Sequence, residues 1–294
     1  MTCQGGNEAH DPGGIVFRIV HKRQLSDVVF EMGVEAPRVA RKVRAGQFLI
    51  LRVDRDGERI PLTFSDWSAE EGWVRFIFMR VGKTTHALSH CEIGDELTDL
   101  VGPLGTPTHV GDLGRVAVVG GGVGAAVAYP VARAMLEAGD DVSVILGART
   151  ADLLVLEDEF RAIEPTRLVV TTDDGSAGVK ALVTTPLKEL CEAGEIDLAF
   201  AVGPAIMMKF CAATTKECGV PCIVSLNPIM VDGTGMCGAC RVSVGGETRF
   251  GCVDGPDFDG HLVDFEELMS RQRVYVEEER LSDSEYSKEC SCRL

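Results

Sequence analysis

The first third of the chain consists of short hydrophobic runs separated by turn residues. The runs VFRIV, DVVFEM, GQFLILRV, WVRFIFMRV and DELTDLVGPLG are rich in β-branched and aromatic side chains. Runs of this length and composition are typical of antiparallel strands. They predict a β-barrel domain over residues 15–111, with one short helix near residues 84–90, where hydroxyl side chains can cap the first turn.

From residue 112 onward, hydrophobic strands alternate with helical segments. The strand VAVVG is followed by a glycine loop, the helix AYPVARAMLEAG and the strand DVSVILGA, and further strands follow at RLVVTT and LAFAVG. This alternation is typical of a parallel sheet that helices cover on both faces. We therefore expect an α/β domain over residues 112–225.

Residues 226–262 lack such periodicity and are rich in glycine and cysteine. We expect something other than a hydrophobic core to hold this segment. The run VDFEELMSRQRVYVEEER predicts one helix, so that residues 263–294 form a C-terminal helix and a polar tail. Residues 1–14 are expected to be a flexible N-terminus.

The charge of the chain excludes two classes of protein. Its 294 residues carry 45 acidic and 29 basic side chains, which gives a formal net charge of −16. Binding to nucleic acid or to a membrane surface requires a cationic face. The longest uncharged stretch, residues 116–132, contains glycines and a proline and is shorter than the ~20 residues that a bilayer requires. The N-terminus has no signal-peptide pattern, so we expect a cytoplasmic protein.

Two motifs in the predicted barrel suit a flavin dinucleotide. After the strand FLILRV, an arginine that can fork onto a pyrophosphate stands near a rigid proline and a small hydroxyl that can hydrogen-bond the isoalloxazine ring. Further on, a glycine turn opens the short predicted helix, whose free amides attract phosphate. Together these motifs predict an FAD site at Arg59, Pro61, Leu62, Thr63, Gly82, Lys83, Thr84 and Thr85.

A glycine-rich loop lies between the strand VAVVG and a helix, as in dinucleotide-binding domains. A mere tight turn is the alternative. The strand DVSVILGA ends at Arg149, which suits a ribose, a 2′-phosphate or an exposed salt bridge, and a Gly-Pro turn follows LAFAVG. We interpret Met207 and Met208 as core residues. The predicted nicotinamide nucleotide site comprises Gly120, Gly121, Gly122, Val123, Gly124, Arg149, Gly203 and Pro204.

The third segment has the spacing Asp232-x4-Cys237-x2-Cys240-x11-Cys252. Iron–sulfur clusters are held by thiolates in tight loops, and glycines let the backbone approach such a cluster. From the cysteines alone, a zinc ion held by them and by Asp232 or His261 is about equally compatible. The glycine density and the flavin motifs upstream favour a [2Fe–2S] cluster in which Asp232 is a harder ligand than thiolate.

The remaining cysteines and the histidines are assigned no chemistry. Five cysteines stand among apolar residues and are expected to be buried and inert: Cys91, Cys191, Cys211, Cys218 and Cys222. Cys290 and Cys292 form a Cys-x-Cys pair in the predicted tail. His86, His90 and His261 are expected to be solvated or hydrogen-bonded, and no catalytic acid or base is predicted.

In this order, the motifs R-x-P-L-T, G-x-x-T, GGGVG, GAR, TDDGS, VGPxxMM and the cysteine loop resemble the ferredoxin–NADP reductase superfamily over nearly the whole chain. The run NPIMVDGTGMCGACRVSVGGETRFGCVDGPDFDGH, with aspartate in the first ligand place, resembles a narrower family. These are the small (alpha) subunits of NADH-dependent reduced ferredoxin:NADP oxidoreductase, also called sulfide dehydrogenase subunits. The related electron-transfer subunits of dihydroorotate dehydrogenase typically have four cysteines in that loop.

The resemblance implies roles for the matched positions. The first motif would hold FAD with Thr63 near the ring, and residues 82–85 would take its pyrophosphate. The glycine loop, Arg149 and the Gly-Pro turn would seat the nucleotide, and Asp232 with the three cysteines would hold the cluster. Two positions depart from common patterns: Val127 replaces a proline, and Val202 replaces a cysteine beside the nicotinamide.

The implied function is electron transfer. Nicotinamide exchanges electrons as hydride, a cluster exchanges them singly, and flavin does both. FAD would therefore transfer electrons between NAD(H) and the cluster, with NADP(H) as the alternative nucleotide. A cluster domain without a substrate pocket implies a partner, which in that family is a larger iron–sulfur flavoprotein subunit that bifurcates electrons and reduces ferredoxin. The alternatives are a dihydroorotate dehydrogenase electron-transfer subunit and a non-catalytic, zinc-stabilised nucleotide-sensing module.

Overall fold

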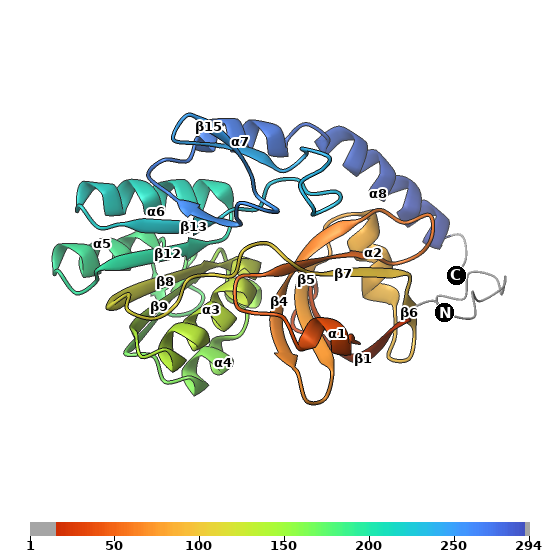
Figure 1. Cartoon of the computed structure of the whole chain (residues 1–294), viewed down its shortest axis with the longest axis horizontal. Helices are drawn as coiled ribbons and strands as arrows, with labels where there is room; N and C mark the ends of the chain where they lie inside the picture. The colour runs from red at the N-terminus through yellow and green to blue at the C-terminus, as the bar shows by residue number, and fades with distance from the viewer. Residues whose placement is uncertain (1–15, 292–294) are drawn as a thin grey trace.

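A computed structural model describes residues 16–291 of the chain. It contains a curled antiparallel sheet, a parallel α/β domain beside it, and a C-terminal segment that extends over both (Figure 1). This architecture agrees with the predicted combination of an antiparallel barrel and a parallel α/β domain. Within the described residues, no helix has the length and apolar character needed to cross a membrane.

The barrel is a seven-stranded antiparallel sheet in the order β6-β1-β2-β5-β4-β3-β7. The two ends of this order, β6 and β7, follow each other in the chain, so the sheet curls on itself. Its inward side chains form one buried core, which includes Ile19, Met32, Leu49, Phe64 and Phe76. The short predicted helix is α2. The elements are β1 (Phe17–Gln24), β2 (Val29–Glu35), α1 (Pro37–Ala40), β3 (Phe48–Arg52), β4 (Ile60–Ser68), β5 (Trp73–Met79), α2 (Lys83–His90), β6 (Glu96–Leu97) and β7 (Asp99–Leu104).

The α/β domain is built on a second sheet, in the order β11-β10-β9-β8-β12-β13-β16. Strands β8 to β13 are parallel. The near-continuous apolar sequences of β8, β9, β12 and β13 are largely buried because helices cover both faces, whereas the edge strand β11 is exposed. The elements are β8 (Arg115–Gly121), η1 (Gly122–Gly124), α3 (Ala125–Glu137), β9 (Asp141–Ala148), η2 (Ala151–Leu153), α4 (Glu157–Ala162), β10 (Arg167–Thr172), β11 (Val179–Lys180), α5 (Thr184–Glu192), β12 (Leu198–Val202), α6 (Ala205–Glu217) and β13 (Cys222–Ser225).

The C-terminal segment is attached to the α/β domain by apolar packing. Its hairpin of β14 (Arg241–Val244) and β15 (Glu247–Phe250) turns at Gly245 and Gly246, whose φ angles of 61° and 79° suit a two-residue hairpin turn. Strand β16 (Asp257–Asp259) then pairs antiparallel with β13 and extends the parallel sheet. The expectation that something other than a hydrophobic core holds this segment is therefore wrong for the hairpin and β16, which join the core of the α/β domain, and the cysteine loop also packs in a small apolar cluster with β3.

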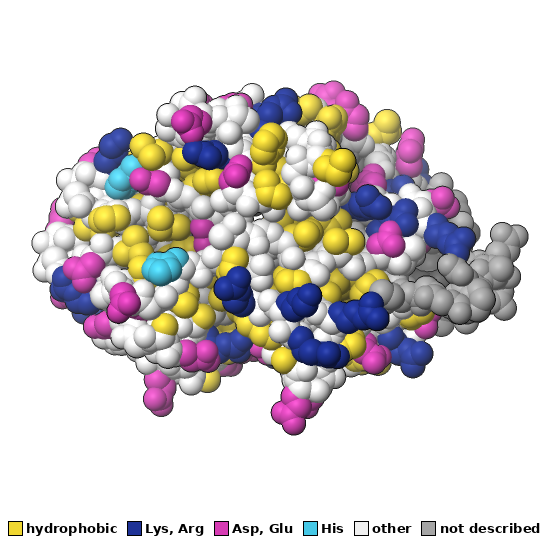
Figure 2. Space-filling model, in the orientation of Figure 1, with side chains coloured by type: hydrophobic (Ala, Val, Ile, Leu, Met, Phe, Trp, Pro, Cys, Tyr) yellow, Lys and Arg dark blue, Asp and Glu magenta, His cyan; other side chains and the backbone are white. Residues whose placement is uncertain are grey.

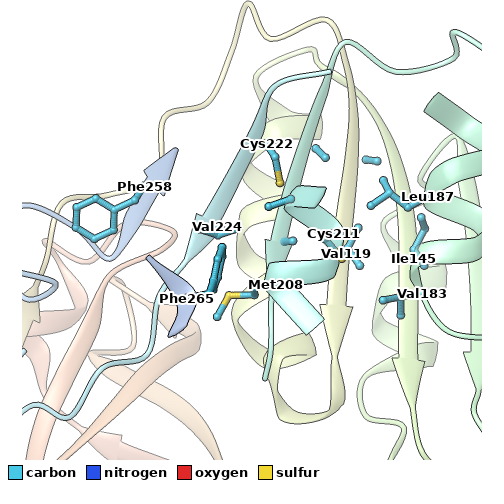
Figure 3. Close-up of a cluster of buried hydrophobic side chains, with 14 of the residues drawn as sticks. Val119, Ile145, Val183, Leu187, Met208, Cys211, Cys222, Val224, Phe258 and Phe265 are labelled. Atoms are coloured by element: carbon cyan, nitrogen blue, oxygen red, sulfur yellow. The ribbon is translucent and has the colours of Figure 1, made fainter. Parts of the chain in front are cut away.

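The C-terminal residues form two helices, α7 (Phe265–Gln272) and α8 (Val276–Ser291), where the sequence predicted one helix and a polar tail. The Asp264 carboxylate caps α7 by accepting a hydrogen bond from the Glu267 amide at 2.9 Å. Phe265 then packs beside Met208 of α6 (Figure 3). α8 packs instead on α2 of the barrel, where Asp283 Oδ1 lies 3.2 Å from His86 Nδ1. A turn is needed because the two helices lie on different domains.

The negative charge of the chain is not uniformly distributed. On the face shown in Figure 2, Lys and Arg side chains gather over the barrel. In sequence, four basic residues stand close together in α1 and the turn that follows it, and all four are exposed: Arg38, Arg41, Lys42 and Arg44. The net charge of −16 therefore does not describe every surface of the protein.

A buried carboxylate lies where the interdomain linker meets the C-terminal segment. Thr108 Oγ1 donates a hydrogen bond to Asp257 Oδ2 at 2.5 Å, and the Thr108 amide donates to the Ala45 carbonyl of the barrel at 3.0 Å. The second oxygen, Asp257 Oδ1, has neither solvent contact nor a hydrogen-bond partner. Burial raises the pKa of Asp257 to about 6.

We predict that Asp257→Asn stabilises the protein above pH 7. Because the folded state holds this proton more tightly than the unfolded chain, the wild type loses stability as pH rises from ~4 through the raised pKa. The variant should gain about 1 kcal/mol at pH 8 relative to pH 5.5, because most of the loss of the wild type has already occurred between pH ~4 and the raised pKa. Chemical denaturation at both pH values measures the effect, with Asp259→Asn on the exposed side of β16 as the control. Parallel pH profiles for wild type and Asp257→Asn would contradict the prediction.

Candidate redox site

The first two predicted cluster ligands, Asp232 and Cys237, form a pair. Asp232 Oδ1 accepts hydrogen bonds from the Thr234 amide at 2.5 Å and from Thr234 Oγ1 at 2.8 Å, and Oδ2 accepts one from the Cys237 amide at 2.8 Å. These donors, those of Thr234 first, hold the pKa of the Asp232 carboxyl well below its usual range. The group is therefore an anion, and Oδ2, which accepts a single hydrogen bond, keeps a lone pair for a metal.

The other two predicted ligands, Cys240 and Cys252, form a second pair. Their Sγ atoms are 3.1 Å apart and both residues are buried. They pack in one apolar cluster with Phe48 and Ile50 of β3. Burial raises the pKa of the Cys252 thiol to about 12, with Cys240 adding to the shift. Without a metal the Cys252 thiol is protonated at neutral pH, and metal binding would release its proton.

Two pairs of ligands suit two iron atoms better than one zinc ion. In the described part of the chain, no three His, Cys, Asp or Glu side chains converge closely enough to hold a single ion. His261, the alternative zinc ligand, has its Nε2 3.0 Å from Thr215 Oγ1 of α6. The charge of Asp232 nevertheless acts on Cys252 and raises its pKa, so the two pairs face a common region. The donor set fits a [2Fe–2S] cluster with two ligands per iron.

Strand β4, which contains Thr63, pairs with β3, the strand on which the cysteine loop packs. In the β3–β4 pair, Phe48 is opposite Thr63 and Ile50 is opposite Pro61. Neighbouring strands are ~4.8 Å apart. On the other side, a Cβ at Gly233 would lie 2.6 Å from Leu104 of β7 and 3.0 Å from Ile50 of β3, so the loop lies directly on the barrel. Since Gly233 has a φ of 76°, the close approach requires glycine.

Two threonines of the second predicted flavin motif form hydrogen bonds within the protein. Thr84 is buried, and its hydroxyl donates to Glu58 Oε2 at 3.0 Å, which ties α2 to the loop before Arg59. Thr85 Oγ1 accepts from the Gly82 amide at 3.1 Å and closes the first turn of α2. Arg59 itself is exposed. Lys83 and the free amides of α2 therefore remain as the candidate phosphate-binding groups of this motif.

The predicted nucleotide residues meet at the carboxyl edge of the parallel sheet. Gly120 of β8 is paired with Val202 of β12, and the chain order reverses between these two strands. Ligands of doubly wound sheets bind at such a point. A Cβ at Gly124 would lie 2.5 Å from the Val202 carbonyl oxygen and 2.8 Å from Gly203 Cα, so the two loops touch backbone to backbone. Arg149 directly follows β9, the strand that pairs with the other side of β8, and its side chain is exposed.

Met207, which we interpreted as a core residue, packs against the core of the α/β domain and also borders this site. Its Sδ lies 2.3 Å from the position of a Cβ on Gly121, and its Cε lies 2.8 Å from that of a Cβ on Gly203. The side chain is only partly buried and lies between the two loops. Because Met207 lies in the first turn of α6, just after the Gly203 turn, the sequence could have indicated that these two residues are neighbours. Only the fold places Gly121 beside them.

A polar contact joins the α/β domain to the barrel. Arg133 of α3 donates from Nη1 to Asp66 Oδ1 of β4 at 3.0 Å. Its guanidinium also lies 5.4 Å from the ring centres of Trp67 and Tyr129, within the range of cation–π contacts. This contact fixes β4 against α3, and so fixes the flavin strand relative to the nucleotide loop at the start of α3.

Two family models match the chain. An iron–sulfur cluster binding domain of dihydroorotate dehydrogenase B matches residues 227–264, and an oxidoreductase NAD-binding domain matches residues 118–213. The first range contains all four predicted cluster ligands. The second contains the glycine loop, Arg149 and the Gly-Pro turn. The two models thus agree with the cluster and the nucleotide that the motifs predict.

Whole-chain relatives are also similar. The chain is 49% identical over 276 residues to a dihydroorotate dehydrogenase B (NAD(+)), electron transfer subunit homolog of Thermotoga maritima, which covers 94% of this chain and 97% of that protein. It is 47% identical to an uncharacterized protein in the adh 3′ region of Clostridium beijerinckii, over 95% of this chain and 99% of that protein.

The chain is also similar to a solved structure, that of an NADH-dependent reduced ferredoxin-NADP oxidoreductase, which was studied for flavin-based electron bifurcation. The two sequences are 49% identical. The TM-score is 0.87 over 94% of this chain and 99% of that chain. This similarity confirms the resemblance predicted from the motifs. It also agrees with the expected electron-transfer role and with a flavin in addition to the cluster and the nucleotide.

We predict that Cys252→Ser removes the cluster and leaves the rest of the protein folded. The wild type should contain about two iron atoms per chain, and the variant should lose the iron and its visible absorption because one iron loses a thiolate. Elemental analysis and thermal unfolding of anaerobically purified protein measure both properties. Cys218→Ser, in a half-buried position of the α/β domain, should keep the iron. A wild type that contains zinc and no iron would refute the assignment.

Proposed function

The chain belongs to the family of dihydroorotate dehydrogenase B electron-transfer subunits and their homologues, and from this premise we propose that it transfers electrons between NAD(H) and a partner protein through FAD and a [2Fe–2S] cluster. The observation that carries the proposal is the contact between the cysteine loop and β3, one strand away from Thr63. Electron transfer between a flavin and a cluster requires that they lie close together, and this contact supports such an arrangement.

Each predicted group has a defined task in this proposal. When bound, FAD exchanges hydride with nicotinamide and single electrons with the cluster. The Arg59 guanidinium forks onto the pyrophosphate, to which Lys83 and the α2 amides also donate. Thr63 hydrogen-bonds the isoalloxazine ring. Asp232 and the three cysteines supply the anionic ligands of the cluster, and the apolar side chains of β3 exclude water from its buried side.

The α/β domain binds the nicotinamide nucleotide in this proposal. The loop at Gly120 to Gly124 approaches the pyrophosphate closely because its glycines carry no side chains, and the amides at the start of α3 donate to it. The Gly203-Pro204 turn and Met207 border the place of the nicotinamide. We propose NAD(H) as the substrate rather than NADP(H), since one similar protein is named for NAD(+) and the similar oxidoreductase, although it also acts on NADP, is NADH-dependent.

We place the chain in the cytoplasm as one subunit of a complex. The partner in this proposal is a larger iron–sulfur flavoprotein that bifurcates electrons and exchanges them with ferredoxin. A partner surface is present beside the cluster loop: Met236 is 89% exposed, Val231 is 48% exposed and Val253 is 44% exposed. Cys237 is also exposed there, so this side of the cluster would face the partner.

A role as the electron-transfer subunit of dihydroorotate dehydrogenase is the second candidate. The match of its iron–sulfur domain model supports it. The chain is 31% identical to such a subunit of Desulforamulus reducens over 81% of its length. Asp232 argues against this role, because a carboxylate stands where four-cysteine loops have a thiolate. The similarity to the bifurcating oxidoreductase is also the greater one.

We predict that NADH bleaches both the flavin and the cluster absorption bands of the anaerobically purified protein. NADPH at the same concentration should reduce it more slowly. In Cys252→Ser, NADH should bleach the flavin band alone, because the acceptor of single electrons is missing. The visible spectrum recorded before and after each addition is the measurement. A wild type that shows neither band, or that NADH does not reduce, would refute the function and favour a zinc-stabilised sensing module.

We further predict that Met236→Glu weakens binding of the larger flavoprotein subunit by about ten-fold or more, because a charge would be buried in an apolar contact. Titration of the purified variant with the larger flavoprotein subunit measures the affinity. The control is Val179→Glu on β11, a 58% exposed position at the opposite edge of the α/β sheet. Equal affinities for the two variants would move the partner surface away from the cluster.

A further inference from the structure

One motif of the α/β domain has no task in the proposed function: the loop after β10, with the sequence TDDGS over residues 172–176. Because β10 is parallel to β9, this loop lies at the same edge of the sheet as Arg149 and the glycine loop. Asp173 and Asp174 are exposed there. Both stand inside the range that the NAD-binding domain model matches, so their charges bear on the nucleotide site.

Hydrogen bonds hold this loop against the residues that follow β9. The Asp173 amide donates to the Ala148 carbonyl at 3.0 Å, and the Asp174 amide donates to the Arg149 carbonyl at 3.2 Å. The Ala151 amide donates to Ser176 Oγ at 2.8 Å. Main-chain contacts therefore place both aspartates beside Arg149, whatever conformation the arginine side chain adopts.

The Asp174 carboxylate has a fixed position. Its Oδ1 accepts hydrogen bonds from the Ser176 amide at 2.9 Å and from Ser176 Oγ at 2.6 Å. These donors, the hydroxyl first, lower the pKa of Asp174, so the group is an anion at neutral pH. A carboxylate has about four acceptor sites. It can therefore accept further hydrogen bonds from a ligand.

Carboxylates outnumber cations at this edge of the sheet. Arg149 and Asp152 are exposed after β9. Asp173 and Asp174 follow β10, and Lys180 ends the exposed two-residue edge strand β11. The loops after β9 and β10 alone carry three carboxylates and one arginine, and Lys180 does not fully balance them. The edge is therefore negative in spite of its arginine.

This charge bears on the choice between the two nucleotides, because NADP carries a phosphate on the 2′ oxygen of the adenosine ribose and NAD does not. In doubly wound domains, an acidic side chain accepts hydrogen bonds from the ribose hydroxyls of NAD, whereas an arginine accommodates the 2′-phosphate of NADP. The second strand of this sheet, β9, ends at Arg149, which by itself would favour NADP. The fold adds the carboxylates of the third strand beside it.

We propose that Asp173 and Asp174 make the nucleotide site selective for NAD(H), by accepting hydrogen bonds from the hydroxyls of the adenosine ribose and by repelling a 2′-phosphate. This inference rests on the proposed function, since it concerns the same nucleotide site. Because Ser176 holds the Asp174 carboxylate in place, that carboxylate cannot turn away from an incoming phosphate. The repulsion then outweighs the attraction that Arg149 exerts.

The test compares binding of NAD⁺ and NADP⁺ to the oxidised full chain loaded with FAD and cluster, by isothermal titration calorimetry. The wild type should bind NAD⁺ about ten-fold more tightly or better. In the double variant Asp173→Asn/Asp174→Asn, NADP⁺ should bind about ten-fold more tightly than to the wild type, because the amides keep acceptor oxygens and remove both charges. Adenosine 2′,5′-bisphosphate should show the same gain relative to adenosine 5′-phosphate, since these ligands contain only the adenosine half.

Asp141→Asn is the matched control. Asp141 begins β9 at the opposite edge of the sheet, and it also accepts a hydrogen bond from a hydroxyl, that of Thr166. This variant should keep the preference of the wild type. If the double variant also keeps it, or if the wild type binds both nucleotides equally, the inference is overturned and the proposed function stands. If the wild type binds neither nucleotide, the proposed function fails and the inference fails with it.

Discussion

The contact of Cys240 and Cys252 with Phe48 and Ile50 of β3 determines how the other parts of the site are arranged. These side chains form one apolar cluster, and Gly233 lets the loop lie directly on the barrel. Because β4 pairs with the other edge of β3, the same contact places the cluster loop one strand from Thr63. A larger side chain at Gly233 would separate the loop from the barrel, and so move the predicted cluster ligands away from Thr63.

The C-terminal segment connects the domains instead of forming one of its own. Strand β16 completes the α/β sheet, α7 packs on α6 through Phe265, and α8 packs on α2 of the barrel. A segment of this size cannot bury a sufficient core alone. It therefore uses the apolar surfaces of both domains. This explains why a loop that carries ligands can be held firmly between them.

Local motifs of the chain are sufficient to name candidate positions for each cofactor. The glycine loop after VAVVG, the short helix after Gly82 and the spacing of Asp232 and the cysteines are short-range patterns, and the structure places each in the expected local setting. Residues whose contacts come from distant parts of the chain were not predictable in this way. Met207 beside Gly121 is an example, since the two residues are far apart in the sequence.

The sequence by itself determined the two domain types, the redox motifs and the anionic character of the cluster ligands, because hydrophobic periodicity, turn residues and ligand spacing act over a few residues. Only the tertiary structure decided that the C-terminal residues form two helices on different domains and that β16 joins a parallel sheet. It also decided that the four ligands form two pairs. These features depend on which surfaces meet after the chain has folded, and burial and hydrogen bonding between remote residues decide among alternatives that look equal in the sequence.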